Sequence, residues 1–207
     1  LYTNEIPVHQ LVGCDRKVKT RIITLGDSVT QGCQTSEFGY QFWAAQLLDQ
    51  LGTEDYSLWN LGIGYARASD CARQGNWLNR AVAGADLITV AFGTNDIISG
   101  PYGGTGHATP EEIEADVRKI TRTCTDAGIR TILWNSPPFD MTPELDGIRT
   151  AYNETVEGIA KDNGATYFDV ASLLADPSDA SKTVYGQHPN DEGGTVITDA
   201  LVKLIQE

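Results

Sequence analysis

The sequence predicts an α/β protein in which a parallel sheet carries helices on both faces. Short apolar runs, typical of buried strands, alternate along the chain with longer stretches of helical periodicity. Strands separated by helices pair in parallel, and the helices then cover both faces of the sheet. The chain has 207 residues, 41% of them hydrophobic, which is enough for one sizeable core.

The first half of the chain contains three of the expected strands. They are residues 21–25, 56–62 and 86–92, and the last of these is the most apolar. A helix over 38–52 ends at a glycine suited to a C-cap, and a second helix covers 67–82. The segment 93–110 follows as a glycine-rich loop whose length suggests a function.

The second half begins with a helix that starts at Pro110, with Thr109 as its N-cap, and ends near Gly128. The remaining elements are a strand over 131–136, a helix over 145–163, a strand over 165–170 and a helix from Asn190 to the C-terminus. We therefore expect a single domain over 21–207, preceded by a lead-in segment over 1–20 that lacks the apolar core of a signal peptide.

Charge and hydropathy exclude several classes of partner. The net charge of −13 argues against binding to nucleic acid or to anionic lipid, because both require a cationic surface. No apolar run is long enough to span a bilayer, so we expect no membrane insertion. A neutral or cationic small molecule is the better partner, and the scarcity of lysine favours an extracytoplasmic location over a cytoplasmic one.

Candidate catalytic residues follow four of the strands. Ligands of such sheets bind at the carboxyl ends of the strands, so the segments 26–30, 60–64, 93–96 and 185–189 should meet at one edge. Ser28 could act there as nucleophile with His188 as its base. The backbone N–H groups of Ser28 and Gly62 and the side-chain amide of Asn95 could form an oxyanion hole.

Each of these residues also has a purely structural interpretation. Ser28 could simply cap a helix, and Gly62 could be a turn residue. Asn95 could hold its own loop together, and His188, which precedes a proline, could lie in a surface turn. The joint placement of all four behind successive strands favours the catalytic interpretation.

The same pattern resembles the SGNH (GDSL-like) hydrolase family. The matching blocks are Gly26-Asp27-Ser28 with Thr30, then Gly62, then Gly93-x-Asn95-Asp96, and finally His188-Pro189. The resemblance implies a flavodoxin-like, three-layer α/β/α fold with a five-stranded parallel sheet. It also implies ester or thioester hydrolysis without a metal or cofactor, and oxyanion donors at Ser28, Gly62 and Asn95. The chain has no G-x-S-x-G, which argues against the α/β-hydrolase nucleophile elbow.

One departure from the family pattern concerns the third member of the triad. The family's last block usually carries Asp three residues before its histidine, and this chain has Tyr185 there. Either a backbone carbonyl or an acid out of register, such as Asp191, could then accept the ring N–H of His188. The carbonyl is favoured, because Asp191 already suits the first turn of the last helix. Tyr185 and Asp27 are candidate substrate-binding residues.

The sequence thus predicts a serine esterase that hydrolyses small acyl esters, acetyl esters above all, with carbohydrates as candidate alcohols. A catalytically impaired module that binds carbohydrate or ester is the alternative, because the acid is absent at Tyr185. A nucleotide- or flavin-binding protein ranks last, since no glycine-rich phosphate motif follows the first strand. The four cysteines, Cys14, Cys33, Cys71 and Cys124, lack metal-site spacing, and a Cys33–Cys71 disulfide is a hypothesis.

Overall fold

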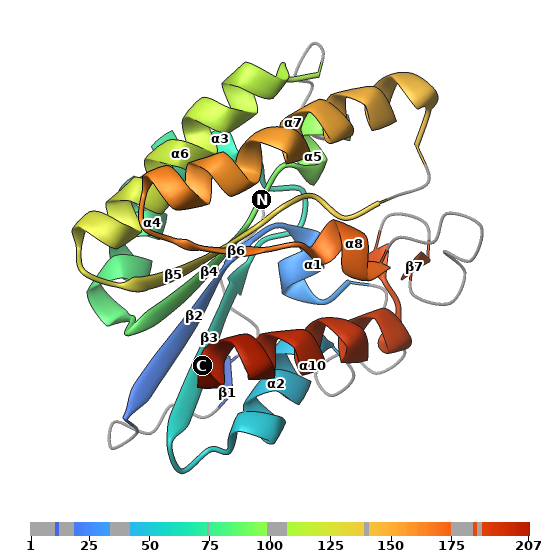
Figure 1. Ribbon diagram of the computed structural model, residues 1–207. Coiled ribbons are helices and arrows are strands. Elements are labelled where there is room, and N and C mark those ends of the chain that lie inside the picture. Colours follow the sequence, from blue (N-terminus) through green and yellow to red (C-terminus); the bar gives the residue numbers. More distant parts are fainter. Residues whose placement is uncertain are drawn as a thin grey trace, which may run out of the picture.

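The computed structural model describes residues 11–12, 19–33, 42–73, 75–98, 107–138, 141–174, 184–185 and 188–207. Five parallel strands form the centre of the molecule (Figure 1). They are β2 (Thr20–Gly26), β3 (Tyr56–Gly62), β4 (Leu87–Ala91), β5 (Arg130–Trp134) and β6 (Thr166–Phe168). These five strands confirm the predicted parallel sheet.

The strands lie in the order β3-β2-β4-β5-β6, so the second strand of the parallel set is placed outside the first. This is the flavodoxin-like order, whose crevice lies where the winding reverses, between the first and third strands. A two-residue strand, β1 (Leu11–Val12), adds to the outer edge of β3 in antiparallel orientation. Gly26 pairs with both Gly62 and Ala91, so the carboxyl ends of the three strands are level at that crevice.

Helices cover both faces of the sheet, and they divide the core into two clusters (Figure 1). One face carries α3 (Ala68–Arg73), α4 (Gly75–Gly84), α6 (Pro110–Asp126) and α7 (Pro143–Asp162). The other face carries α2 (Trp43–Leu51), α8 (Val170–Leu174) and α10 (Asp191–Gln206). No helix in these described ranges is long and apolar enough to cross a membrane.

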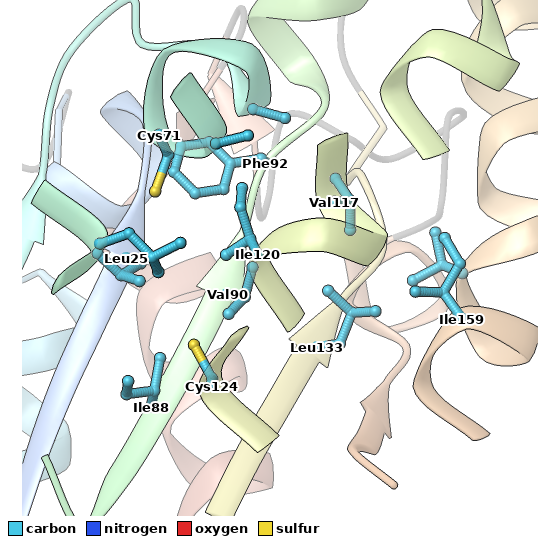
Figure 2. Close-up of a cluster of buried hydrophobic side chains, with 14 of the residues drawn as sticks. Leu25, Cys71, Ile88, Val90, Phe92, Val117, Ile120, Cys124, Leu133 and Ile159 are labelled. Carbon is cyan, nitrogen blue, oxygen red and sulfur yellow. The ribbon is translucent and has the colours of Figure 1, made fainter. Parts of the chain in front are cut away.

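The two clusters differ in composition. On the α6 and α7 side, aliphatic side chains of the strands meet those of the helices, as Figure 2 shows for Val90, Ile120, Leu133 and others. On the opposite side the ring of Trp134 lies between Trp43 and Phe168, with centroids 4.9 and 5.0 Å away. Every residue of β4 is buried, which explains the strength of its apolar signal in the sequence.

Two segments differ in structure from the prediction, and the short elements β1 and α8 were not expected at all. The expected helix over 67–82 is two helices, α3 and α4, and residue 74 between them lies outside the described residues. The expected loop over 93–110 begins with a short helix, α5 (Thr94–Ile98). Glycine suits position 93 for two reasons. Its φ is 127°, a conformation that other residues rarely adopt, and a Cβ there would lie only 2.7 Å from the ring of Tyr152.

The helix that precedes β5 begins as the sequence predicts. Thr109 caps α6, and its side chain accepts a hydrogen bond from the Glu112 N–H while Glu112 bonds back to the Thr109 N–H. This reciprocal capping box satisfies two backbone donors that the helix itself cannot satisfy.

Candidate active site

Ser28 and His188 are 160 positions apart in the chain, and the fold brings their side chains into contact. His188 Nε2 lies 2.8 Å from Ser28 Oγ. Ser28 is the first residue of α1 (Ser28–Gln31), directly after β2, and His188 lies in β8 (His188–Pro189), just before α10. A hydroxyl and an imidazole at this distance can share a proton, which is what activation of a serine requires.

The position of Ser28 follows from its neighbours in sequence. Asp27 caps α1, and its carboxylate accepts a hydrogen bond of 2.9 Å from the Val29 N–H. Gly26 leaves room for the turn: a Cβ there would lie 2.5 Å from the Ala91 carbonyl oxygen and nearer still to Thr30 Oγ1. Any other residue at position 26 would therefore displace the start of α1.

Gly62 lies against the backbone of α1. A Cβ at this position would come within 2.6 Å of the carbonyl carbon of Thr30 and still closer to the Gln31 backbone nitrogen. The Gly62 N–H, a predicted oxyanion donor, donates a 2.9 Å hydrogen bond to Asn60 Oδ1 in this structure. The glycine is thus required by close packing, whatever its N–H contributes to chemistry.

Asn60 is a residue of the site that the sequence analysis did not single out. It is 1% exposed, its amide donates to the Thr30 carbonyl at 2.7 Å, and its Oδ1 accepts from Thr24 Oγ1 at 3.1 Å. Together with its bond to Gly62, these contacts tie β2, β3 and α1 to one side chain. An amide inside a mostly apolar strand was the available signal, because strands disfavour Asn.

Asn95 lies on α5 and is 8% exposed. Its amide nitrogen donates a 3.0 Å hydrogen bond to the carbonyl of Ala66, in the loop that follows β3. A side-chain amide has two N–H donors, so one bond fixes its orientation and the other N–H can serve a ligand. The level carboxyl ends of β2, β3 and β4 place Ser28, Gly62 and Asn95 at the same edge of the sheet.

Two buried carboxyl groups lie beneath this edge. Asp27 is 1% exposed and Asp96 is 2% exposed, and Asp96 accepts a 3.0 Å hydrogen bond from the Ala68 N–H. Burial, reinforced by the neighbouring charge of Asp96, raises the pKa of Asp27 to about 7. Burial likewise raises the pKa of Asp96 to about 6. At 1% exposure, Asp27 acts as a helix cap facing the interior, and not as a residue accessible to substrate.

His188 has one ring nitrogen on Ser28, and the other, Nδ1, is buried. Within the described part of the chain, Nδ1 has no hydrogen-bond partner. Neither expected acceptor, a backbone carbonyl or Asp191, is therefore confirmed. Burial lowers the pKa of His188 below its ordinary value, which favours the neutral ring that a base requires.

Tyr185 occupies the position of the family's acid and lies in β7 (Val184–Tyr185), directly opposite His188 in the β7–β8 pair. This places its backbone beside the site. The predicted contact of its side chain with substrate lies outside what the structure describes.

The hypothesis of a Cys33–Cys71 disulfide is wrong for this structure. Both cysteines are free, as is Cys124. Cys71 is fully buried in the apolar cluster between the sheet and α6, whereas Cys33 lies at the end of α1 with its sulfur 3.7 Å from Gln31 Oε1. Cys14 lies outside the described residues. Within the described ranges no group of three or more His, Cys, Asp or Glu side chains could hold a metal ion.

The chain belongs to the GDSL-like Lipase/Acylhydrolase family, whose model matches residues 24–196. That range includes Ser28, Gly62, Asn95 and His188, and the match confirms the family predicted from the motifs. The protein is accordingly a carboxylic ester hydrolase, a serine esterase that acts on acyl esters.

Solved structures of esterases share the fold. An acetyl-xylooligosaccharide esterase from Geobacillus stearothermophilus is 18% identical with a TM-score of 0.74, and the match covers 92% of this chain and 95% of that one. An acetyl xylan esterase, AlAXEase, is 18% identical with a TM-score of 0.72, covering 89% and 99%. The psychrotrophic esterase EstA from Pseudoalteromonas sp. is 17% identical with a TM-score of 0.70, covering 90% and 97%.

A curated protein also matches part of the sequence. The acireductone dioxygenase of Hahella chejuensis is 35% identical over 72 residues, which are 35% of this chain and 39% of that protein. The chain thus spans about two fifths of this relative's length.

Proposed function

We propose that the protein hydrolyses small acyl esters, acetyl esters above all, with Ser28 as nucleophile and His188 as general base. The 2.8 Å contact between Ser28 Oγ and His188 Nε2 carries this proposal. His188 Nε2 accepts the hydroxyl proton as Oγ attacks the ester carbonyl, and the imidazolium then returns that proton to the leaving alcohol. Water, activated by the same ring, attacks the acyl-enzyme and releases the carboxylic acid.

Negative charge develops on the carbonyl oxygen during both steps. The Ser28 N–H lies at the N-terminus of α1, where the first N–H groups have no acceptor inside the helix. The second N–H of the Asn95 amide is the other donor, because the first is held by Ala66. The Gly62 N–H contributes if its bond to Asn60 is shared with the oxyanion.

We further propose that His188 acts in a dyad. The buried Nδ1 has no partner in the described part of the chain, and a tyrosine replaces the family's acid at position 185. A dyad operates without a carboxylate to stabilise imidazolium, so it depends on a ring that is neutral at the working pH. The burial that lowers the pKa of His188 meets that condition.

A carbohydrate is the proposed alcohol half of the ester. Two of the similar structures are named as acetyl xylan or acetyl-xylooligosaccharide esterases, a likeness at the level of the fold. The net charge of −13 disfavours anionic substrates and is compatible with a neutral sugar. The same two names support acetate as the acyl group, and rates on p-nitrophenyl acetate, butyrate and octanoate test that preference.

The deciding experiment replaces Ser28 by alanine. We expect Ser28→Ala to lower kcat/KM on p-nitrophenyl acetate by at least about 10³-fold, because nucleophile and base act as a unit. Ser69→Ala, a change on α3, is the matched control and should retain the parent's rate. An active Ser28→Ala chain would refute the assignment.

A catalytically impaired binding module is the second candidate, and the unpartnered Nδ1 of His188 is the observation that favours it. A fluorophosphonate probe separates the two. Labelling of the parent but not of Ser28→Ala would support the esterase. An unlabelled parent that still binds an acetylated xylo-oligosaccharide would support the module.

A further inference from the structure

Residues 63–66 form a tight turn directly after Gly62, at the rim of the candidate active site. The Ala66 N–H donates to the Ile63 carbonyl at 3.1 Å, which makes Gly64 and Tyr65 the two central residues. Tyr65 has a φ of 66°, and it is the one non-glycine residue with positive φ in the described ranges. The third position of such a turn normally takes glycine or asparagine, because a Cβ is strained there.

The turn is held on three sides by residues of the site. The Ile63 N–H donates to the Gly26 carbonyl at 3.0 Å, and the Ala66 carbonyl accepts from Asn95 at 3.0 Å. A Cβ on Gly64 would lie 2.8 Å from Gln31 Oε1, so the turn also packs on α1, the helix that begins with Ser28. The segment is therefore fixed between the nucleophile's helix and the amide of Asn95.

Neither the turn nor the core accounts for a tyrosine at position 65. Tyr65 is 54% exposed and Ile63 is 45% exposed, and both belong to the small group of large apolar side chains that the described part of the chain leaves open to solvent. The backbone would be relaxed with glycine or asparagine at position 65. Strain of this kind persists where a function requires the side chain.

We infer that Tyr65, supported by Ile63, is the platform that binds the sugar ring of the substrate's alcohol half. This inference rests on the proposed esterase activity and deepens it. A phenol ring offers a flat apolar face with a polar edge, which suits a neutral pyranose better than it suits a charged group. The acetyl group requires little surface, whereas a ring linked to it extends beyond the reacting carbonyl toward the rim, where the turn lies.

The test compares two acetate esters that differ only in the alcohol. One is methyl xyloside carrying acetyl groups, and the other is ethyl acetate, whose alcohol is too small to reach the rim. The readout is the ratio of kcat/KM values for the two esters. Tyr65→Asn removes the ring and suits the backbone, Tyr65→Phe keeps the ring, and Trp59→Thr removes an exposed aromatic from β3 as the matched control.

We expect Tyr65→Asn to lower the ratio by roughly three- to ten-fold, mainly through KM for the xyloside, which is the range that aromatic contacts are worth. Tyr65→Phe and Trp59→Thr should keep the parent's ratio, and Tyr65→Asn should melt no lower than the parent. An unchanged ratio in Tyr65→Asn, an equal loss in Tyr65→Phe, or a lowered melting temperature of Tyr65→Asn would overturn the inference.

Different results would overturn the proposed esterase activity and the proposed Tyr65 platform. A parent that cleaves both esters in a Ser28-dependent manner, with a ratio insensitive to Tyr65, would retain the esterase and overturn the platform. A parent that cleaves neither ester would overturn both.

Discussion

Asp27 immediately precedes Ser28, yet its carboxyl group is buried beside a second buried carboxyl, that of Asp96. The carboxylate of Asp27 has a structural role, because it caps α1 by accepting a hydrogen bond from the Val29 N–H. Its cost is electrostatic, since burial disfavours the ionised form. The residue that orients the candidate nucleophile therefore lowers the stability of the fold as pH rises from about 4 to about 7.

Replacement of Asp27 by asparagine should reveal this cost. Because burial raises the pKa of Asp27 from 3.8 to about 7, the folded state binds the proton more tightly than the unfolded state does. Stability is then greatest at acid pH and falls as pH rises from about 4 to 7, by at most about 4 kcal/mol. Asn keeps the cap without the charge, so Asp27→Asn should raise the unfolding free energy at pH 8 by about 2 kcal/mol or more.

Urea unfolding between pH 4 and pH 8 measures the effect. The fall in stability over this range should become shallower in Asp27→Asn and should be unchanged in Asp49→Asn, which alters an exposed carboxylate on α2. An Asp27→Asn chain less stable than the parent at pH 8 would show that the carboxylate is charged and well paired.

The pH dependence of catalysis distinguishes a dyad from a triad. His188 must be neutral to act as base, and burial lowers its pKa from 6.5. We therefore expect the acid limb of the kcat/KM profile on p-nitrophenyl acetate to have its midpoint below pH 6.5. A midpoint above that value would indicate a carboxylate that stabilises the imidazolium.

At the scale of elements, helix starts place the catalytic side chains. Asn190 caps α10 two residues after His188, and its side chain accepts from the Gly193 N–H at 2.9 Å. Thr109 caps α6, and it is far from both Ser28 and His188 along the chain. The two caps perform the same structural task, and only one of them adjoins the candidate base.

This pair of caps gives a matched experiment. Asn190→Ala and Thr109→Ala should each lower the unfolding free energy by about 1 kcal/mol, the usual value of an N-cap. Only Asn190→Ala should also reduce kcat, because it loosens the segment that carries His188. Equal kcat values for both variants and the parent would mean that β8 alone positions the histidine.

At the scale of the whole molecule, α2 and α10 pack together on one face of the sheet, one after the Ser28 segment and the other after the His188 segment in sequence. The last helix, α10, packs beside α2 and contributes Ile197, Leu201 and Ile205 to their shared cluster. Arg130, at the start of β5, donates to the Ile205 and Leu204 carbonyls at 2.8 and 2.6 Å. The helix that follows His188 is thus anchored to the sheet and to this cluster.

A core substitution distant from the edge should separate stability from catalysis. Leu201 is fully buried, so Leu201→Ala should cost about 3 kcal/mol of unfolding free energy through lost burial and a cavity. Gln206→Ala, at an exposed position of the same helix, should be near neutral. Both variants should retain the parent's kcat well below their melting temperatures, and a large loss of kcat in Leu201→Ala would show that the cluster controls the site directly.

The sequence by itself predicted the strands and most helices, because buried strands are apolar throughout and amphipathic helices have their own period. The segment 67–82, the start of the 93–110 loop and the unexpected elements β1 and α8 differ from this prediction. The turn that starts α5 depends on the φ of 127° at Gly93 and on the nearby ring of Tyr152, a residue distant in the chain. Local sequence patterns do not predict contacts with residues that are distant in the chain.

For the site, the motifs predicted Ser28, Gly62, Asn95 and His188 from the sequence alone, because parallel strands all end at the same edge of the sheet. Only the tertiary structure decided which groups are in contact: the 2.8 Å pair of Ser28 and His188, the bond from Gly62 to Asn60, and the unpartnered Nδ1. It also decided that Asp27 is buried and that Tyr65 has a strained backbone. Residue type fixes what a group can do, whereas hydrogen bonding, burial and strain arise only when distant segments meet.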